Sequence, residues 1–136
     1  VSASDASPAA VEVARANAER LGLPLEVRVE RGVPKGEPPE GGGGADLVLA
    51  NLPYVREDEW DALAPEIRRY EPREALVSGA DGLDAIRELC AATAAGTRLA
   101  LEHAPGQAAE VRGLIRDAHT LRDLAGRERV TMGSAP

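Results

Sequence analysis

Aromatic residues are almost absent from this sequence. It contains no phenylalanine, and Trp60, Tyr54 and Tyr70 are the complete aromatic set among 136 residues. A hydrophobic core must therefore be built from alanine, valine and leucine. Burying such small side chains removes little apolar surface from water, so we expect a shallow core of modest stability.

Cysteine and histidine are scarce as well. Cys90 is the single cysteine, which excludes an internal disulfide, and with only two histidines we expect no metal site. The apolar periodicity around Cys90 places it in a core. No apolar run approaches the roughly 20 residues that cross a bilayer, and no targeting pattern is visible. We therefore expect a cytoplasmic protein without membrane contact.

Positive charge is the third deficit. Asp+Glu number 23 against 16 Lys+Arg, which gives a formal net charge of -7. Proteins that bind polyanions normally carry a basic surface, so this balance disfavours direct nucleic-acid binding.

Strand and helix patterns alternate along the chain, whose length allows a single domain over residues 1–136. Strands are predicted at residues 1–5, 25–30, 46–50, 97–101 and 130–132. Helices are predicted at residues 8–22, 82–95 and 107–118, the first between a Ser7-Pro8 start and a terminating Gly22. Residues 31–45 are rich in proline and glycine and predict a flexible loop. The alternation favours a doubly wound, Rossmann-like α/β sheet.

Two polar residues follow strands of this predicted sheet. Ligands of doubly wound sheets bind outside the carboxyl ends of the strands. Asp5 ends the first strand, where a carboxylate can accept hydrogen bonds from both hydroxyls of a ribose, although it can equally help Ser7 to cap the helix. Asn51 follows residues 46–50, whose continuous apolar run predicts a strand buried on both faces.

The segment Asn51-Leu52-Pro53-Tyr54 carries the strongest chemical signal. A side-chain amide oxygen and a backbone carbonyl provide two acceptors, and an aromatic ring provides a flat surface. Together they can hold a planar NH₂ group and direct its nitrogen toward an electrophile. The alternative is a plain turn with Tyr54 in the core.

This tetrapeptide resembles motif IV of class I S-adenosylmethionine-dependent methyltransferases that modify amide or amino nitrogens. Flanking segments resemble, in order, the release factor N(5)-glutamine methyltransferase (HemK-type) family over nearly the whole chain. These segments are Val1–Leu23, Asp46–Tyr54, Glu71–Leu76 with Gly79–Leu83, Leu101–His103 with Gln107, and Asp123–Val130.

The resemblance implies methyl transfer from S-adenosylmethionine to the glutamine side-chain amide in the GGQ motif of class I peptide chain release factors. It also implies catalytic roles for Asn51, Pro53 and Tyr54, with the Leu52 carbonyl as second acceptor. Asp5, with Asn51, would contact the cofactor. A C-terminal antiparallel hairpin is expected as well.

Other matched segments have simpler interpretations. Glu71-Pro72 and residues 79–82 are typical of turns. Arg127 and Arg129 are expected at the surface or beside carboxylates. Glu102 and His103 end a strand on the ligand side, where they are expected to line the cleft.

The family's helical domain, first strand and Gly-rich cofactor loop have no counterpart before Asp5, and Gly41–Gly44 does not fit that loop. We therefore expect a partial, N-terminally truncated methyltransferase domain that is inactive alone. Residues 32–34 lack the acidic residue that related sequences carry near the adenine. Leu52 stands where a second proline is usual.

Three alternatives stay open. The Asn-Leu-Pro-Tyr segment also fits an adenine-amino methyltransferase that acts on RNA or DNA. The acidic composition argues against that alternative. The missing loop fits a non-catalytic remnant of a methyltransferase. A small nucleotide-binding Rossmann protein lacks its glycine fingerprint before Asp5.

Overall fold

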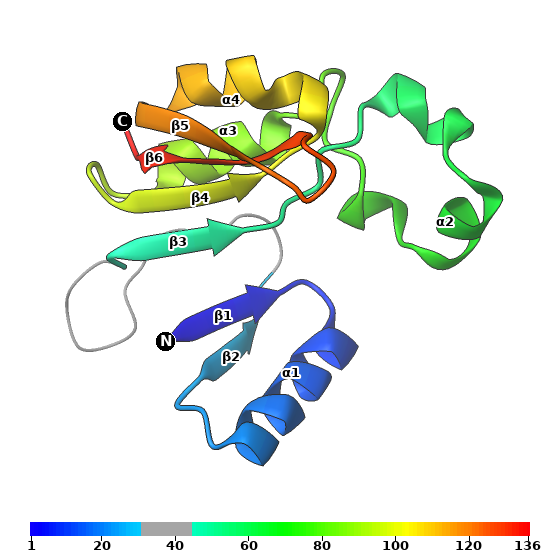
Figure 1. The fold of residues 1–136 in the computed structure, drawn as a ribbon. Helices are drawn as coiled ribbons and strands as arrows, with labels where there is room; N and C mark the ends of the chain where they lie inside the picture. Colours follow the sequence, from blue (N-terminus) through cyan, green and yellow to red (C-terminus); the bar gives the residue numbers. More distant parts are fainter. Residues whose placement is uncertain (31–44) are drawn as a thin grey trace.

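The computed structural model describes residues 1–30 and 45–136, and strands in these ranges form two separate sheets (Figure 1). The smaller sheet pairs β1 (Ser2–Asp5) with β2 (Glu26–Val29) in parallel. The larger sheet has the order β3-β4-β6-β5 and contains β3 (Leu47–Ala50), β4 (Arg98–Glu102), β5 (Arg116–Arg122) and β6 (Glu128–Ser134). Apart from Ala45, the predicted loop over 31–45 lies outside the described residues.

Helix α1 (Pro8–Leu21) begins and ends at the residues that the sequence predicts. The Ser7 hydroxyl accepts from the backbone N–H of Ala10, and Pro8 occupies the first turn, where its missing N–H costs nothing. Gly22 ends the helix with a left-handed φ of 64°, a conformation that glycine adopts without steric cost.

Helix α1 packs on β2. Val11 and Ala18 of the helix and Val27 of the strand are buried. The Arg15 guanidinium donates from Nε and Nη2 to the Val27 carbonyl oxygen, at 3.0 and 2.6 Å. A charge-assisted fork therefore supplements a small apolar contact.

The main core lies between the larger sheet and two helices that cover one of its faces, α3 (Asp84–Ala92) and α4 (Ala108–Leu114) (Figure 1). Leu99 and Leu101 of β4 are buried there with Ile86 and Val111 of the helices. Cys90 is buried in the same cluster, as predicted, and burial raises the pKa of its thiol because it disfavours the thiolate.

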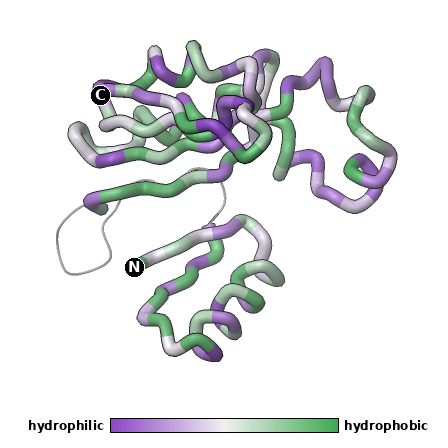
Figure 2. Tube along the Cα trace, viewed as in Figure 1, coloured by the Kyte–Doolittle hydropathy of each residue, from purple (hydrophilic) through white to green (hydrophobic). Residues whose placement is uncertain are grey.

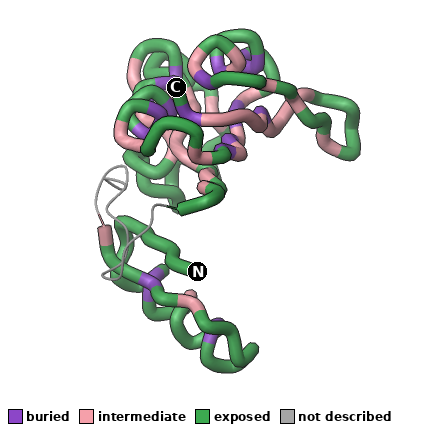
Figure 3. Tube along the Cα trace, turned by 90° about the vertical axis from the view of Figure 1, so that its left-hand side faces the viewer, coloured by how far each residue is buried: buried purple, intermediate pink, exposed green. Residues whose placement is uncertain are grey.

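Strand β3 is covered on one face only, so the prediction of a strand buried on both faces is wrong. Val48 and Ala50 pack against the core, but Leu47 and Leu49 are 46% and 75% exposed. Figure 2 shows the apolar character of β3, and Figure 3 shows that most buried residues lie in the part of the molecule that contains the C-terminus. The reason is that α3 and α4 lie on one face, and among the described strands only β4 pairs with β3.

The last two strands differ most from the sequence prediction. Helix α4 ends at Leu114, and β5 begins at Arg116 within the range predicted as helix. Strand β6 is longer than the predicted residues 130–132 and pairs antiparallel with both β4 and β5. A break in pairing register between Arg116 and His119, with Asp117 at a φ of 53°, interrupts the strand periodicity that would have indicated β5.

A small lobe extends from the sheet between β3 and α3 (Figure 1). It contains a 3-10 helix at Glu57–Ala62, helix α2 (Pro65–Tyr70) and a 3-10 helix at Arg73–Ala75. Val55 and Val77 pair at its base, so the lobe leaves and rejoins the domain at one place.

None of the helices in the described ranges is long and apolar enough to cross a membrane.

Candidate active site

The segment Asn51-Leu52-Pro53-Tyr54 leaves the carboxyl end of β3, as the sequence predicts. Asn51 is exposed, and no hydrogen bond to another described residue engages its side-chain amide. Leu52 is half-buried and packs against the main core. The core thus anchors the segment through the Leu52 side chain, while the Asn51 amide oxygen stays available to an external donor.

Gln107 holds the backbone of Tyr54 in place. Its Nε2 donates to the Tyr54 carbonyl oxygen at 2.9 Å and to the Asp81 carbonyl oxygen at 3.0 Å. Its Oε1 accepts from the Ala104 N–H at 2.9 Å. The side chain is buried, and both Nε2 protons and the amide oxygen are in use.

Gly82 leaves the space in which this contact forms. Its φ of 77° lies in the left-handed region, and a Cβ added there would collide with the Tyr54 carbonyl oxygen and with Gln107 Nε2. Both the backbone conformation and the close approach therefore require glycine. Gly79 also has a positive φ, of 74°, so the turn predicted over residues 79–82 is confirmed.

The carboxylate of Asp81 fixes the same turn. It accepts from the Leu83 N–H at 3.1 Å and forms an ion pair with Arg87. The Arg87 hydrogen bond, supported by that N–H, lowers the pKa of Asp81 to about 2. This carboxylate therefore stays charged well below physiological pH, and its contacts with Leu83 and Arg87 hold the turn before α3.

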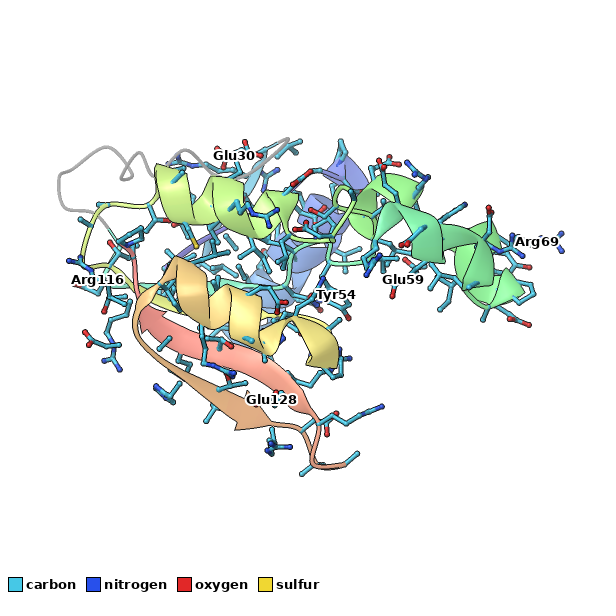
Figure 4. All side chains as sticks on the ribbon, turned by 90° about the horizontal axis from the view of Figure 1, so that it is seen from above. Glu30, Tyr54, Glu59, Arg69, Arg116 and Glu128 are labelled. Atoms are coloured by element: carbon cyan, nitrogen blue, oxygen red, sulfur yellow. The ribbon has the colours of Figure 1, made fainter. Side chains whose placement is uncertain are left out.

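Arg129 contacts the other side of Tyr54. Its guanidinium carbon lies 5.7 Å from the centroid of the Tyr54 ring, and Nη1 donates to the His103 carbonyl oxygen at 3.2 Å. Figure 4 shows Tyr54 between helices α3 and α4 and the lobe. Arg127 forms the predicted ion pair with a carboxylate, that of Asp123, at 2.9 Å. Arg129 instead lies over the Tyr54 ring.

His103 is fully buried, so the prediction that it lines the cleft is wrong. Its Nδ1 lies 2.8 Å from the Ala104 carbonyl oxygen, which can only accept, and therefore carries the proton. Its Nε2 lies 2.8 Å from the Thr131 hydroxyl oxygen, which lies 2.9 Å from the Thr120 hydroxyl oxygen, and the Thr120 hydroxyl accepts from Arg112 at 2.9 Å. This ordered chain ties β4, β5, β6 and α4 together and gives His103 a structural role.

Asp5 ends β1 as predicted, but β1 and β3 belong to different sheets, so strand pairing does not join Asp5 to Asn51. Its Oδ1 accepts from the Ser7 N–H at 2.7 Å, which supports the helix start. The second carboxylate oxygen is exposed with the rest of the residue. The local geometry thus shows the capping role directly.

Sequence reasoning missed the bracing roles of Gln107, Gly82 and Arg129. Gln107 lies 53 residues after Tyr54 and 26 after Asp81, so local pattern carries no information about these contacts. The signals in the sequence are the family resemblance of the segments with Gln107 and Arg129 and the glycine-rich residues 79–82. They predict a tight turn but leave the contacts with Tyr54 unspecified.

The described part of the chain thus combines an α/β sheet with an Asn-Leu-Pro-Tyr segment at the carboxyl end of β3. No protein-family model matches the chain. Curated proteins named release factor glutamine methyltransferase do. The one from Cereibacter sphaeroides is 40% identical and aligns with 98% of the chain and 50% of its own length. Those from Gloeobacter violaceus (44% identical, 94% of the chain) and Clostridium acetobutylicum (35%, 95%) align over 48% of their lengths.

The chain is therefore homologous to the release factor glutamine methyltransferases, and it spans about half the length of the curated relatives it matches.

Proposed function

We propose that this chain forms the substrate-amide side of a methyltransferase site that acts on the GGQ glutamine of class I peptide chain release factors. The names of its relatives support this substrate. The observation that carries the proposal is the geometry of the Asn51–Tyr54 segment. It presents an exposed amide at the end of a strand, while the core contacts the Leu52 side chain and Gln107 holds the Tyr54 carbonyl.

Each residue of the segment has a separate task in this proposal. The Asn51 amide oxygen accepts one N–H of the substrate amide, and the Leu52 carbonyl accepts the other. Pro53 fixes the backbone between them and Tyr54, whose ring packs on the flat face of the amide. Two acceptors and one plane define the direction of the substrate nitrogen.

Orientation is the main source of catalysis in this scheme. The lone pair of a glutamine amide is delocalised, so holding the nitrogen in line with the methyl donor contributes more than a general base. His103 is fully used in structural hydrogen bonds, in agreement with a mechanism that needs no histidine.

S-adenosylmethionine, when bound, supplies a methyl group made electrophilic by its sulfonium. Of the described residues, Asp5 and Asn51 are the ones we propose to contact it. Asp5 fits a ribose because one carboxylate oxygen supports Ser7 and the other is exposed. Strands β1 and β3, which end at Asp5 and just before Asn51, belong to separate sheets.

We further propose that a strand between β1 and β3 completes the domain and that the chain is inactive without it. Each of these strands has one described neighbour only, and the curated relatives are about twice as long as the matched region. Calorimetry with S-adenosylmethionine is expected to detect no micromolar binding to this chain. Micromolar affinity, about -8 kcal/mol, would contradict the proposed inactivity.

The substrate side is testable separately. Asn51→Ala is expected to weaken binding of a Gly-Gly-Gln peptide about tenfold, because one hydrogen bond and the orientation it gives are lost. NMR titration of the chain with the peptide measures this. Asn17→Ala, on the exposed surface of α1, is the matched control. Equal affinity of both variants would contradict the role of Asn51.

A further inference from the structure

We propose that Gln107 is a positioning residue that sets the backbone of the Asn51–Tyr54 segment and thereby aims the Leu52 carbonyl at the substrate amide. The inference rests on the proposed function for the identity of that amide. The positioning itself follows from hydrogen bonds within the chain.

The Gln107 amide connects three segments that are distant in sequence. Its oxygen accepts from Ala104 beside it, and its nitrogen donates to carbonyls of Tyr54 and Asp81. One donor faces the oxygen and two carbonyls face the nitrogen, so only one orientation of the amide satisfies all three bonds. No other side chain of similar size offers two N–H donors and one acceptor in a neutral plane.

The constraint on Tyr54 extends back to Leu52. Tyr54 is two residues after Leu52, and Pro53 between them has its φ restricted by the ring. Fixing the Tyr54 carbonyl therefore leaves little freedom to the peptide plane that contains the Leu52 carbonyl. Arg129 restricts the Tyr54 ring from the other side, at 5.7 Å.

We call the three hydrogen bonds of the Gln107 amide, to Ala104, Tyr54 and Asp81, the brace. The residues around Gln107 leave space for it and supply its partners. Gly82 has no side chain at the point where Gln107 meets the Tyr54 carbonyl, and Asp81 supplies a carbonyl from the same turn. A buried polar group that joins this turn to the candidate site through hydrogen bonds is placed for positioning.

Gln107→Glu is the sharpest test because it changes one atom. The introduced carboxylate can still accept from the Ala104 N–H, but its second oxygen faces the carbonyl oxygens of Tyr54 and Asp81 and repels them. Gln107→Met keeps the size and removes every hydrogen bond without adding charge. Glu110→Gln, on the exposed surface of α4, which follows Gln107, is the control for a change of charge nearby.

The readout is the NMR signal of the Tyr54 ring. The chain has two tyrosines and no phenylalanine, so Tyr70→Phe assigns both, and exposed Tyr70 serves as an internal reference. We expect Gln107→Glu and Gln107→Met to shift the Tyr54 signals, leave Tyr70 unchanged and weaken Gly-Gly-Gln peptide binding about tenfold, as Asn51→Ala does. A purely structural Gln107 would lower the denaturation midpoint without moving Tyr54 or the affinity, and this would overturn the proposal.

A second measurement needs no variant. Gln107 is the only glutamine of the chain and Asn17 and Asn51 are its only asparagines, so selective ¹⁵N labelling of glutamine and asparagine gives three side-chain NH₂ pairs. We expect the Gln107 protons to exchange with solvent at least about tenfold more slowly than those of exposed Asn17. Exchange at the Asn17 rate would overturn the brace even if the variants do not fold. If the wild-type chain shows the brace but binds no Gly-Gly-Gln peptide, the proposed function fails and the positioning of Tyr54 stands.

Discussion

Gly82→Ala is expected to lower the free energy of unfolding by about 3 kcal/mol and to displace the Tyr54 carbonyl. A left-handed backbone costs an alanine about 1–2 kcal/mol, and the added Cβ collides with the Tyr54 carbonyl oxygen and Gln107 Nε2. Chemical denaturation measures the first effect, and the NMR signals of the Tyr54 ring report the second.

Gly126→Ala is the matched control, because Gly126 has nearly the same φ, 78° against 77°, and nothing lies within 4 Å of an added Cβ. It is expected to cost about 1 kcal/mol, the backbone term alone. If both variants lose the same free energy, the collision at Gly82 has no energetic weight and the account of the turn is wrong.

Leu99→Ala is expected to destabilise the chain by about 2–5 kcal/mol. Leu99 is fully buried in β4 between strand neighbours and the helices α3 and α4, so truncation leaves a cavity that the surroundings cannot fill. In a protein with few large core residues, such a loss is a large share of a stability of about 5–15 kcal/mol. Urea denaturation followed by circular dichroism measures it.

The companion variant is Leu124→Ala in the loop between β5 and β6. Leu124 is fully exposed, and its truncation is expected to change stability by less than about 0.5 kcal/mol. A small effect at Leu99, comparable with that at Leu124, would mean that the main core does not lie between β4 and the two helices.

The parts of the fold that the sequence predicts correctly depend on local chemistry. The start of α1 at Ser7-Pro8 and its end at Gly22 follow from capping. Strand β2 follows from the alternation of apolar and charged residues, and β3 and β4 follow from short apolar runs, all within one or two residues of their observed bounds. Each signal needs only neighbouring residues, which is why it can be read without the fold.

The errors in the fold concern what lies beside an element. The apolar run of β3 predicts two covered faces, but coverage depends on helices elsewhere in the chain, and Leu49 remains exposed. The range 107–118 reads as one helix, yet pairing with β6 draws Arg116 and its neighbours into β5. Tertiary contacts decide both cases.

The candidate site divides in the same way. The position of Asn51 and Tyr54 at the end of β3 could be predicted because the segment and the preceding strand are continuous in sequence. Gln107 and Arg129 could not, because their contacts with Tyr54 span long separations and involve a backbone carbonyl or a ring face, neither of which leaves a pattern in the sequence.

The brace also fixes when the Tyr54 turn can form during synthesis. Tyr54 is translated 53 residues before Gln107, which at about 5–20 residues per second is an interval of about 3–10 seconds. Arg129 comes later still, and β6, which carries it, enters the sheet between two strands that are already made. A nascent chain therefore exposes the Asn-Leu-Pro-Tyr segment without its final shape until β6 and Arg129 have been synthesised.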